Sequence, residues 1–116
     1  MTTWNLTPHG LVLCRLDGST QEIPASGHVV RLATTEEPHE DVAGLPCVST
    51  VYGELTGVPL EVAPGDVLLA SSMVADRVAN KYPACRVLVP DTGPTAVRDA
   101  AGRIHGVRQF RRVAVS

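Results

Sequence analysis

The chain of 116 residues has the length of a single domain, and its 44% hydrophobic and 19% charged residues are typical of a globular protein rather than a disordered tail. No apolar run approaches the ~20 residues of a membrane-spanning helix, and the N-terminus lacks the pattern of a secretory signal. The net charge of −2 hides an asymmetry: residues 1–76 hold ten acidic side chains and two arginines, whereas residues 77–116 hold eight basic and two acidic ones. The basic half is either an anion-binding region or the complement of the acidic half within one fold.

The chain begins with an arm, residues 1–9, that carries polar side chains around a proline. Asn5, Thr7 and His9 either form a simple turn or contribute to a site before the first strand. In a site, the His9 imidazole would suit ligand binding or proton transfer, because its ordinary pKa lies near neutrality.

The next elements are predicted to be hairpins and loops. Strands at about 10–16 and 20–24 flank an Asp-Gly turn, which is a strong hairpin signal. A β-branched strand follows at 28–34. Residues 34–46 are polar, acidic and interrupted by a proline, which predicts a surface loop, and a strand follows at 47–55.

Residues 66–90 show the clearest pattern in the chain. The apolar runs 66–70 and 85–89 are typical of strands buried on both faces. Between them, apolar residues recur every four positions, which predicts an amphipathic helix over about 72–82 with a serine at its N-cap. A strand, a helix and a strand at this spacing predict one βαβ unit with parallel strands.

The C-terminal part predicts a hairpin whose turn ends at Gly102, in the left-handed conformation. The last strand is expected over about 103–115. It places Arg108, Phe110 and Arg112 on one face, which is either a solvated hairpin face or a nucleic-acid contact. The elements together predict an α+β fold, a mostly antiparallel β domain with one βαβ unit and a single helix.

Cysteine and histidine positions bear on the compartment and on metals. Cys14, Cys47 and Cys85 are odd in number and not spaced as Cys-x-x-Cys, which disfavours a disulfide framework and a zinc ribbon. Each lies among apolar neighbours, so we expect buried free thiols and a reducing cytoplasm. The scattered histidines complete no ligand pattern, and we predict neither a metal nor a cofactor.

Asp91, Thr92 and Gly93 form the Asp-Thr-Gly triplet that carries the catalytic carboxylate of aspartic proteases. That chemistry needs two carboxylates sharing a proton, and a retroviral-type chain places most of its fold after the triplet. Here only residues 94–116 follow, and they form an arginine-rich hairpin. These features disfavour a protease.

The βαβ unit supports another interpretation of the triplet. Parallel strands end at the same edge of a sheet, so Ser71 and Ser72 after the first strand should lie near Asp91 and Thr92 after the second. The start of the helix adds free N–H groups and partial positive charge, which suit an anion. The alternative is a structural role, because serine caps helices and Asp-Thr-Gly-Pro forms turns.

Three segments together resemble a family of small uncharacterised proteins found in bacterial and phage genomes. The segments are NLTPH (5–9), VPDTGP (89–94) and RDAAGRIHGVRQF (98–110), and the resemblance spans nearly the whole chain. The resemblance implies no activity and no catalytic residues. It implies that the match to aspartic proteases is coincidental, and the phage association implies capture of a host nucleotide or signalling molecule.

The sequence therefore predicts a protein that binds a phosphate-bearing small molecule such as a nucleotide. An arginine would neutralise the phosphate, for which its planar donors are well matched. One alternative is an enzyme with His9 or Asp91 as general base, and another is a nucleic-acid- or protein-binding module that uses the arginine-rich hairpin. Exposed strand edges also favour a homodimer. The expected ligand-binding residues are Asn5, Thr7, His9, Ser71, Ser72, Asp91, Thr92 and Arg98.

Overall fold

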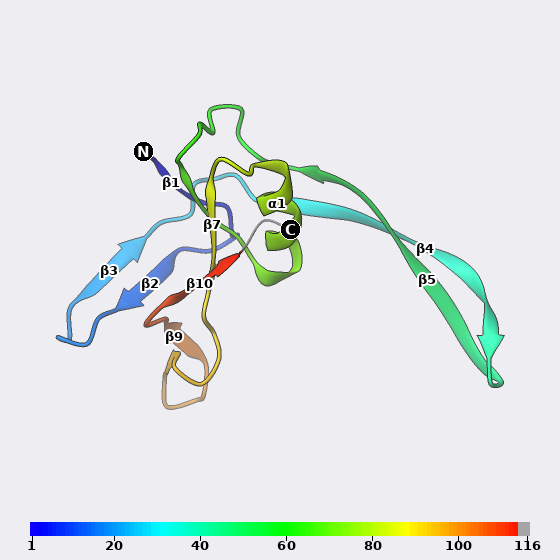
Figure 1. Cartoon of the computed structure of the whole chain (residues 1–116). Helices are drawn as coiled ribbons and strands as arrows, with labels where there is room; N and C mark the ends of the chain where they lie inside the picture. The colour runs from blue at the N-terminus through cyan, green and yellow to red at the C-terminus, as the bar shows by residue number, and fades with distance from the viewer. Residues whose placement is uncertain (114–116) are drawn as a thin grey trace.

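The computed structural model describes residues 1–113, which form an α+β fold with one helix, as predicted (Figure 1). A four-stranded sheet in the order β1-β6-β7-β10 is accompanied by the two-stranded sheets β2–β3, β4–β5 and β8–β9. No helix within residues 1–113 is long and apolar enough to cross a membrane. The elements are β1 (Thr3–Asn5), β2 (Leu11–Cys14), β3 (Thr20–Ile23), β4 (Arg31–Val42), β5 (Leu45–Thr56), β6 (Val67–Leu69), α1 (Ser72–Lys81), β7 (Arg86–Pro90), β8 (Val97–Arg98), β9 (Ile104–Gly106) and β10 (Phe110–Val113).

The predicted βαβ unit is confirmed and contains the centre of the core. β6 and β7 are parallel, with Leu68 opposite Val87, and α1 connects them. The apolar stripe of α1 buries Val74 and Val78 in the core, which also contains Leu68 and Val87. Both central strands are therefore fixed by packing, which gives their carboxyl ends defined positions.

The N-terminal arm is a strand of this sheet rather than a loose segment. β1 pairs in parallel with β6, and the buried Asp66 fixes that pairing. Its carboxylate accepts hydrogen bonds from the backbone N–H of Thr2 at 2.9 Å, the backbone N–H of Ala63 at 3.0 Å and the indole N–H of Trp4 at 3.0 Å. The sheet thus has three parallel strands that end at one edge.

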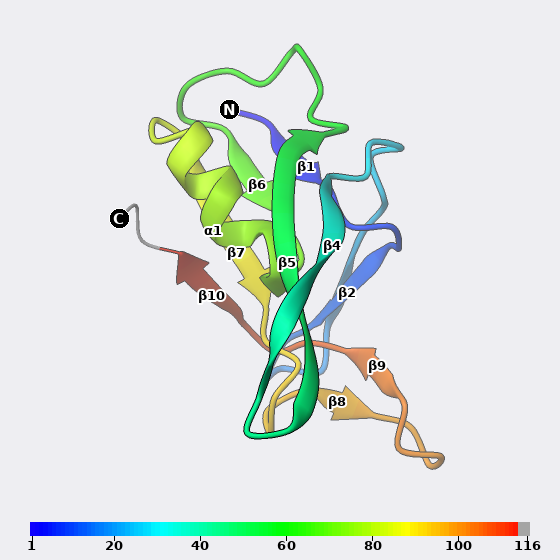
Figure 2. The ribbon, with the colours of Figure 1, turned by 90° about the vertical axis from the view of Figure 1, so that its right-hand side faces the viewer.

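The prediction of a surface loop over residues 34–46 was wrong. β4 continues through Pro38, turns at Ala43 and Gly44, and pairs antiparallel with β5 along a long arm. Each strand of a two-stranded ribbon is an edge, so a proline is tolerated where its missing N–H costs no cross-strand hydrogen bond. Figure 1 shows the arm projecting away from the body of the molecule, and in Figure 2 the arm points toward the viewer and passes in front of the body.

The two shorter hairpins confirm their turn signals. β2 and β3 pair around the Asp17-Gly18 turn. β8 and β9 pair around a turn in which Gly102 has φ of +81°, the left-handed conformation that the sequence predicted. Glycine is favoured there because it adopts positive φ without a side-chain clash.

The prediction of one long C-terminal strand was wrong. The chain breaks between β9 and β10, where Val107 forms a parallel bridge to Leu13 of β2. β10 then pairs antiparallel with β7. Val107 is buried and exchanges backbone hydrogen bonds with Val12 and Cys14 of β2, and this contact accompanies the change of direction. The predicted end of the strand at residues 114 and 115 lies outside the described residues.

The cysteines are free thiols, but they are less enclosed than the sequence predicted. Cys14, Cys47 and Cys85 are each only half-buried. Cys47 lies on the projecting arm, where little can cover it.

Candidate functional site

The carboxyl ends of the three parallel strands meet at one cleft of about 480 Å³. Thr7 follows β1, Ser71 and Ser72 follow β6, and Asp91 and Thr92 follow β7, and all of them line this cleft. Segments far apart in the sequence are therefore brought together at the edge of the sheet. The volume lies within the ~300–1,000 Å³ of small-molecule sites.

The N-terminal motif positions Thr7 through the side chain of Asn5. Asn5 is 1% exposed, and its amide donates to the carbonyl oxygens of His9 at 2.9 Å and Ile23 at 3.1 Å. Asn5 Oδ1 accepts the backbone N–H of Thr7 at 3.1 Å and lies 2.6 Å from the Thr7 hydroxyl. Asn5 is thus occupied in shaping the turn. Thr7 lines the cleft, but its hydroxyl also lies 2.9 Å from the carbonyl oxygen of His9 and is part of the same turn.

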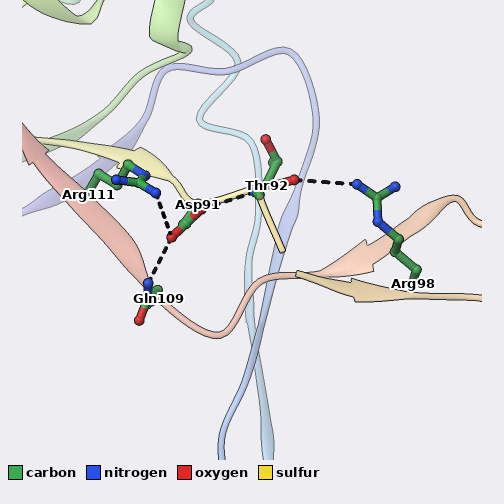
Figure 3. A network of polar contacts seen from close by, with 6 residues as sticks. Asp91, Thr92, Arg98, Gln109 and Arg111 are labelled. Atoms are coloured by element: carbon green, nitrogen blue, oxygen red, sulfur yellow. Dashed lines mark hydrogen bonds and ion pairs between the residues drawn. The ribbon is translucent and has the colours of Figure 1, made fainter. Parts of the chain in front are cut away.

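Asp91 organises the loop after β7 in a comparable way. Its carboxylate is 3% exposed and accepts the backbone N–H of Gly93 at 3.0 Å and the amide of Gln109 at 2.8 Å. Arg111 on β10 lies 3.5 Å from the same carboxylate. Figure 3 shows Asp91 facing both Gln109 and Arg111, so the carboxylate ties the end of β7 to β10.

These partners determine the protonation of Asp91. The hydrogen bonds from Gln109 and Gly93, together with the positive charge of Arg111, hold the pKa of Asp91 below its ordinary value despite burial. A carboxylate with a lowered pKa and occupied oxygens accepts a proton poorly. The geometry therefore gives Asp91 a positioning role and gives no support to its use as a general base.

The start of α1 opens onto the cleft without a side-chain cap. Ser71 occupies the N-cap position in an extended conformation, yet its side chain makes no capping hydrogen bond. The first turn contains no acidic residue. Both serines are exposed, and backbone N–H groups at a helix start carry partial positive charge. An anion in the cleft would supply the acceptor that the sequence omits.

Three predicted residues, Asn5, His9 and Arg98, are not part of the lining. His9 is exposed, and the turn uses its carbonyl oxygen. The Arg98 guanidinium donates to the carbonyl oxygens of Gly102 at 2.8 Å and Thr92 at 3.5 Å, which braces the β8–β9 hairpin. Figure 3 places Arg98 beyond Thr92, on the side away from Arg111.

Arg111 is the arginine that lines the cleft, and the sequence reasoning missed it together with Gln109 and His105. The expectation that residues following neighbouring strands meet at one edge of the sheet applies to parallel strands only. β10 is antiparallel to β7 and sets Arg111 opposite Val89, beside the triplet. A prediction that the last strand pairs with β7 would have identified it.

The predicted face of Arg108, Phe110 and Arg112 does not form one regular strand surface. Arg108 lies in the break between β9 and β10, whereas Phe110 and Arg112 belong to β10. Phe110 is half-buried, and both arginines are exposed. The aromatic ring is therefore not freely available for stacking on a base, although the arginines keep the surface basic.

The remaining wall of the cleft is apolar and depends on a close backbone contact. Leu11 and Val12 of β2 face the segment from Ile104 to Val107. Val107 N–H donates to the Val12 carbonyl oxygen at 2.8 Å. Gly106 permits this approach, since a Cβ there would lie 2.8 Å from that same carbonyl oxygen.

Among the described residues, no group of three histidine, cysteine or acidic side chains is arranged to hold a metal ion. Comparison with known proteins finds no matching family model, and neither a curated protein nor a solved structure matches the chain.

Proposed function

We propose that the protein binds a phosphate-bearing small molecule, such as a nucleotide, in the cleft at the carboxyl edge of its parallel strands. The observation that carries the proposal is the convergence of the exposed hydroxyls of Ser71, Ser72 and Thr92 on one cleft at the uncapped start of α1. Hydroxyl groups and free backbone N–H groups are the donors that phosphate oxygens accept.

The charge of the cleft is compatible with this ligand class. Arg111 is bound to Asp91 through one nitrogen, and its side chain is 69% exposed, which leaves further donors for a ligand. Asp91 adds a negative charge to the cleft, but Arg111 partly neutralises it, and the carboxylate oxygens face Gly93, Gln109 and Arg111. The helix start and Arg111 then provide the positive side of the site.

The apolar wall supplies the second part of a nucleotide site. Leu11, Val12 and Val107 lie opposite the polar strand ends within the same cleft. An apolar surface with a few polar groups at one end is the usual design of small-molecule sites. The phosphate would lie at α1, and the base or sugar would lie along β2.

Binding without turnover is the function that these contacts support best. Neither base predicted from the sequence is placed for catalysis, because Asp91 is held by its hydrogen bonds and His9 lies outside the cleft, although His105 does line the cleft. Under the resemblance to bacterial and phage proteins, tight binding without turnover would sequester a nucleotide signal in the cytoplasm. Native mass spectrometry of freshly purified protein tests this directly, since a sequestered nucleotide would be released on denaturation.

The sharpest test of the phosphate site replaces Ser71. Asp and Asn both cap helices about as well as Ser, so Ser71→Asp and Ser71→Asn should both fold. Only Ser71→Asp places a negative charge at the helix start, and we expect it to weaken nucleotide binding by at least about tenfold. Ser71→Asn carries no charge and should retain more affinity than Ser71→Asp, although it also loses the Ser71 hydroxyl.

Titration calorimetry with nucleosides and their mono-, di- and triphosphates is the measurement. Affinity that rises from the nucleoside to its phosphates, and that Ser71→Asp removes, supports the proposal. Nucleosides binding as tightly as nucleotides, or equal affinities in the two Ser71 variants, would place the phosphate elsewhere and overturn it.

A further inference from the structure

We propose that the β4–β5 arm is an interface for a second copy of this chain, and that it docks on the arginine-bearing surface of β8–β10 of that copy. The arm comprises residues 31–56, and the arginine-bearing surface comprises residues 97–113. The proposal does not require a ligand in the cleft, although the arginine-bearing surface shares Arg111 with the cleft wall.

The outer part of the arm is a long two-stranded hairpin without a core of its own to stabilise it. Two strands of 12 residues each form a ribbon about 40 Å long at ~3.4 Å per residue. The base of the arm packs on the body, through the partly buried Leu32 and Leu55 against the core and Tyr52 against Arg77 of α1. An isolated two-stranded hairpin is marginal in water and presents two unpaired edges, so the outer part needs a partner.

The outer arm also exposes apolar side chains that a monomer would normally bury. Val42, Leu45 and Val48 are 55%, 65% and 61% exposed. Val51 and Tyr52 continue the apolar surface toward the base. Exposed apolar residues gathered on one projecting element are typical of an interaction site.

The charges of the two surfaces identify the partner as another copy. The arm carries five acidic residues and a single arginine at its base, and it contains no lysine. The arginine-bearing surface carries five arginines and one acidic residue. The acidic residues are Glu36, Glu37, Glu40, Asp41 and Glu54, and the arginines are Arg98, Arg103, Arg108, Arg111 and Arg112.

These opposite charges do not neutralise each other within one chain. Within residues 1–113 the only ion pair joins Arg111 to Asp91, which lies outside the arm. Figure 1 shows the tip of the arm on the far side of the molecule from β9 and β10. A second copy can bring the two surfaces together, and a twofold arrangement would satisfy both arms at once.

Charge reversal with mixing tests the docking. Glu36→Arg with Glu37→Arg changes the arm, and Arg108→Glu with Arg112→Glu changes the surface without touching Arg111. Both pairs of positions are exposed, so the variants should fold. Glu22→Arg with Glu61→Arg, at exposed positions outside the arm, has the same charge change as the arm variant and serves as its control.

The expected result is a wild-type dimer or higher oligomer in light scattering and native mass spectrometry, with dissociation favoured by salt. Each interface variant alone should be monomeric, and the control should associate like the wild type. An equimolar mixture of the two interface variants should form a complex that contains one copy of each. A monomeric wild type at about 100 μM, or an oligomer that survives either charge reversal, would overturn the proposal.

Discussion

Asp66 is the side chain on which attachment of the N-terminal strand depends. Its hydrogen bonds with Ala63, Thr2 and Trp4 lower its pKa from 3.8 to about 2. The folded protein therefore binds this proton more weakly than the unfolded chain does. The resulting stabilisation is fully present above about pH 4 and is lost as the pH falls from 3.8 toward about 2.

Asp66→Asn is expected to destabilise the protein at neutral pH and to reduce the loss of stability in acid. The asparagine turns an N–H₂ group toward donors that the carboxylate accepted. Urea unfolding followed by fluorescence of Trp4, the only tryptophan in the chain, measures both effects at about pH 7 and about pH 3. Asp76→Asn on the exposed side of α1 is the control, and an unchanged acid response in Asp66→Asn would contradict the assignment.

Individual polar residues also show how far the sequence determines a site. The sequence was enough to bring Ser71 and Asp91 together, because both follow strands of a βαβ unit whose edges coincide. It did not distinguish side chains that reach a cleft from those that shape a turn. Asn5 and Arg98 are occupied by backbone carbonyls that only the folded chain places beside them.

At the scale of elements, β9 forms a wall of the cleft because its last residue has no side chain. Gly106→Ala is expected to cost about 1–3 kcal/mol, since the new methyl group would meet the Val12 carbonyl oxygen and Cys14 Sγ, each at 2.8 Å. The backbone oxygen cannot rotate away as a flexible side chain would. To relieve the clash, β9 would have to move away from β2. That movement should also weaken the binding of any ligand held between the two strands.

Gly10→Ala is the matched control for that variant. Gly10 lines the same cleft, but a Cβ there meets its nearest neighbours at 3.7 and 3.8 Å, which is ordinary contact. Urea unfolding should show Gly10→Ala within about 0.5 kcal/mol of the wild type. Equal stability of the two variants would show that the β9–β2 contact tolerates a methyl group.

The elements that the sequence missed share a physical cause. β1 spans three residues, too few for alternation to appear, and its pairing depends on a carboxylate more than 60 positions away. The outer part of β4 lacks a buried face, so its residues show no alternation of apolar and polar side chains, whereas most of β5 was predicted as the strand over 47–55. Strands buried in the core, such as β6 and β7, were predicted because burial imposes the pattern that sequence reasoning detects.

At the scale of the whole molecule, the arm makes the chain unusually extended. The radius of gyration is 17.1 Å, whereas a compact domain of this length has about 13 Å. The core, the sheet and the cleft all belong to the body, and the outer arm contributes to none of them. Stability of the body and stability of the arm should therefore be separable.

Shortening the arm tests that separation. Thr35 and Val51 are directly opposite, so an Asn-Gly turn joining them replaces residues 36–50 with a short hairpin. At concentrations where the wild type is monomeric, the two proteins should unfold within about 0.5 kcal/mol of each other, because the removed residues pack on nothing in the body. At higher concentration the wild type alone should gain stability, since association stabilises the folded state by mass action. If the shortened protein is strongly destabilised in dilute solution, the arm supports the fold itself. If the stability of both proteins depends equally on concentration, the arm is not what joins the copies.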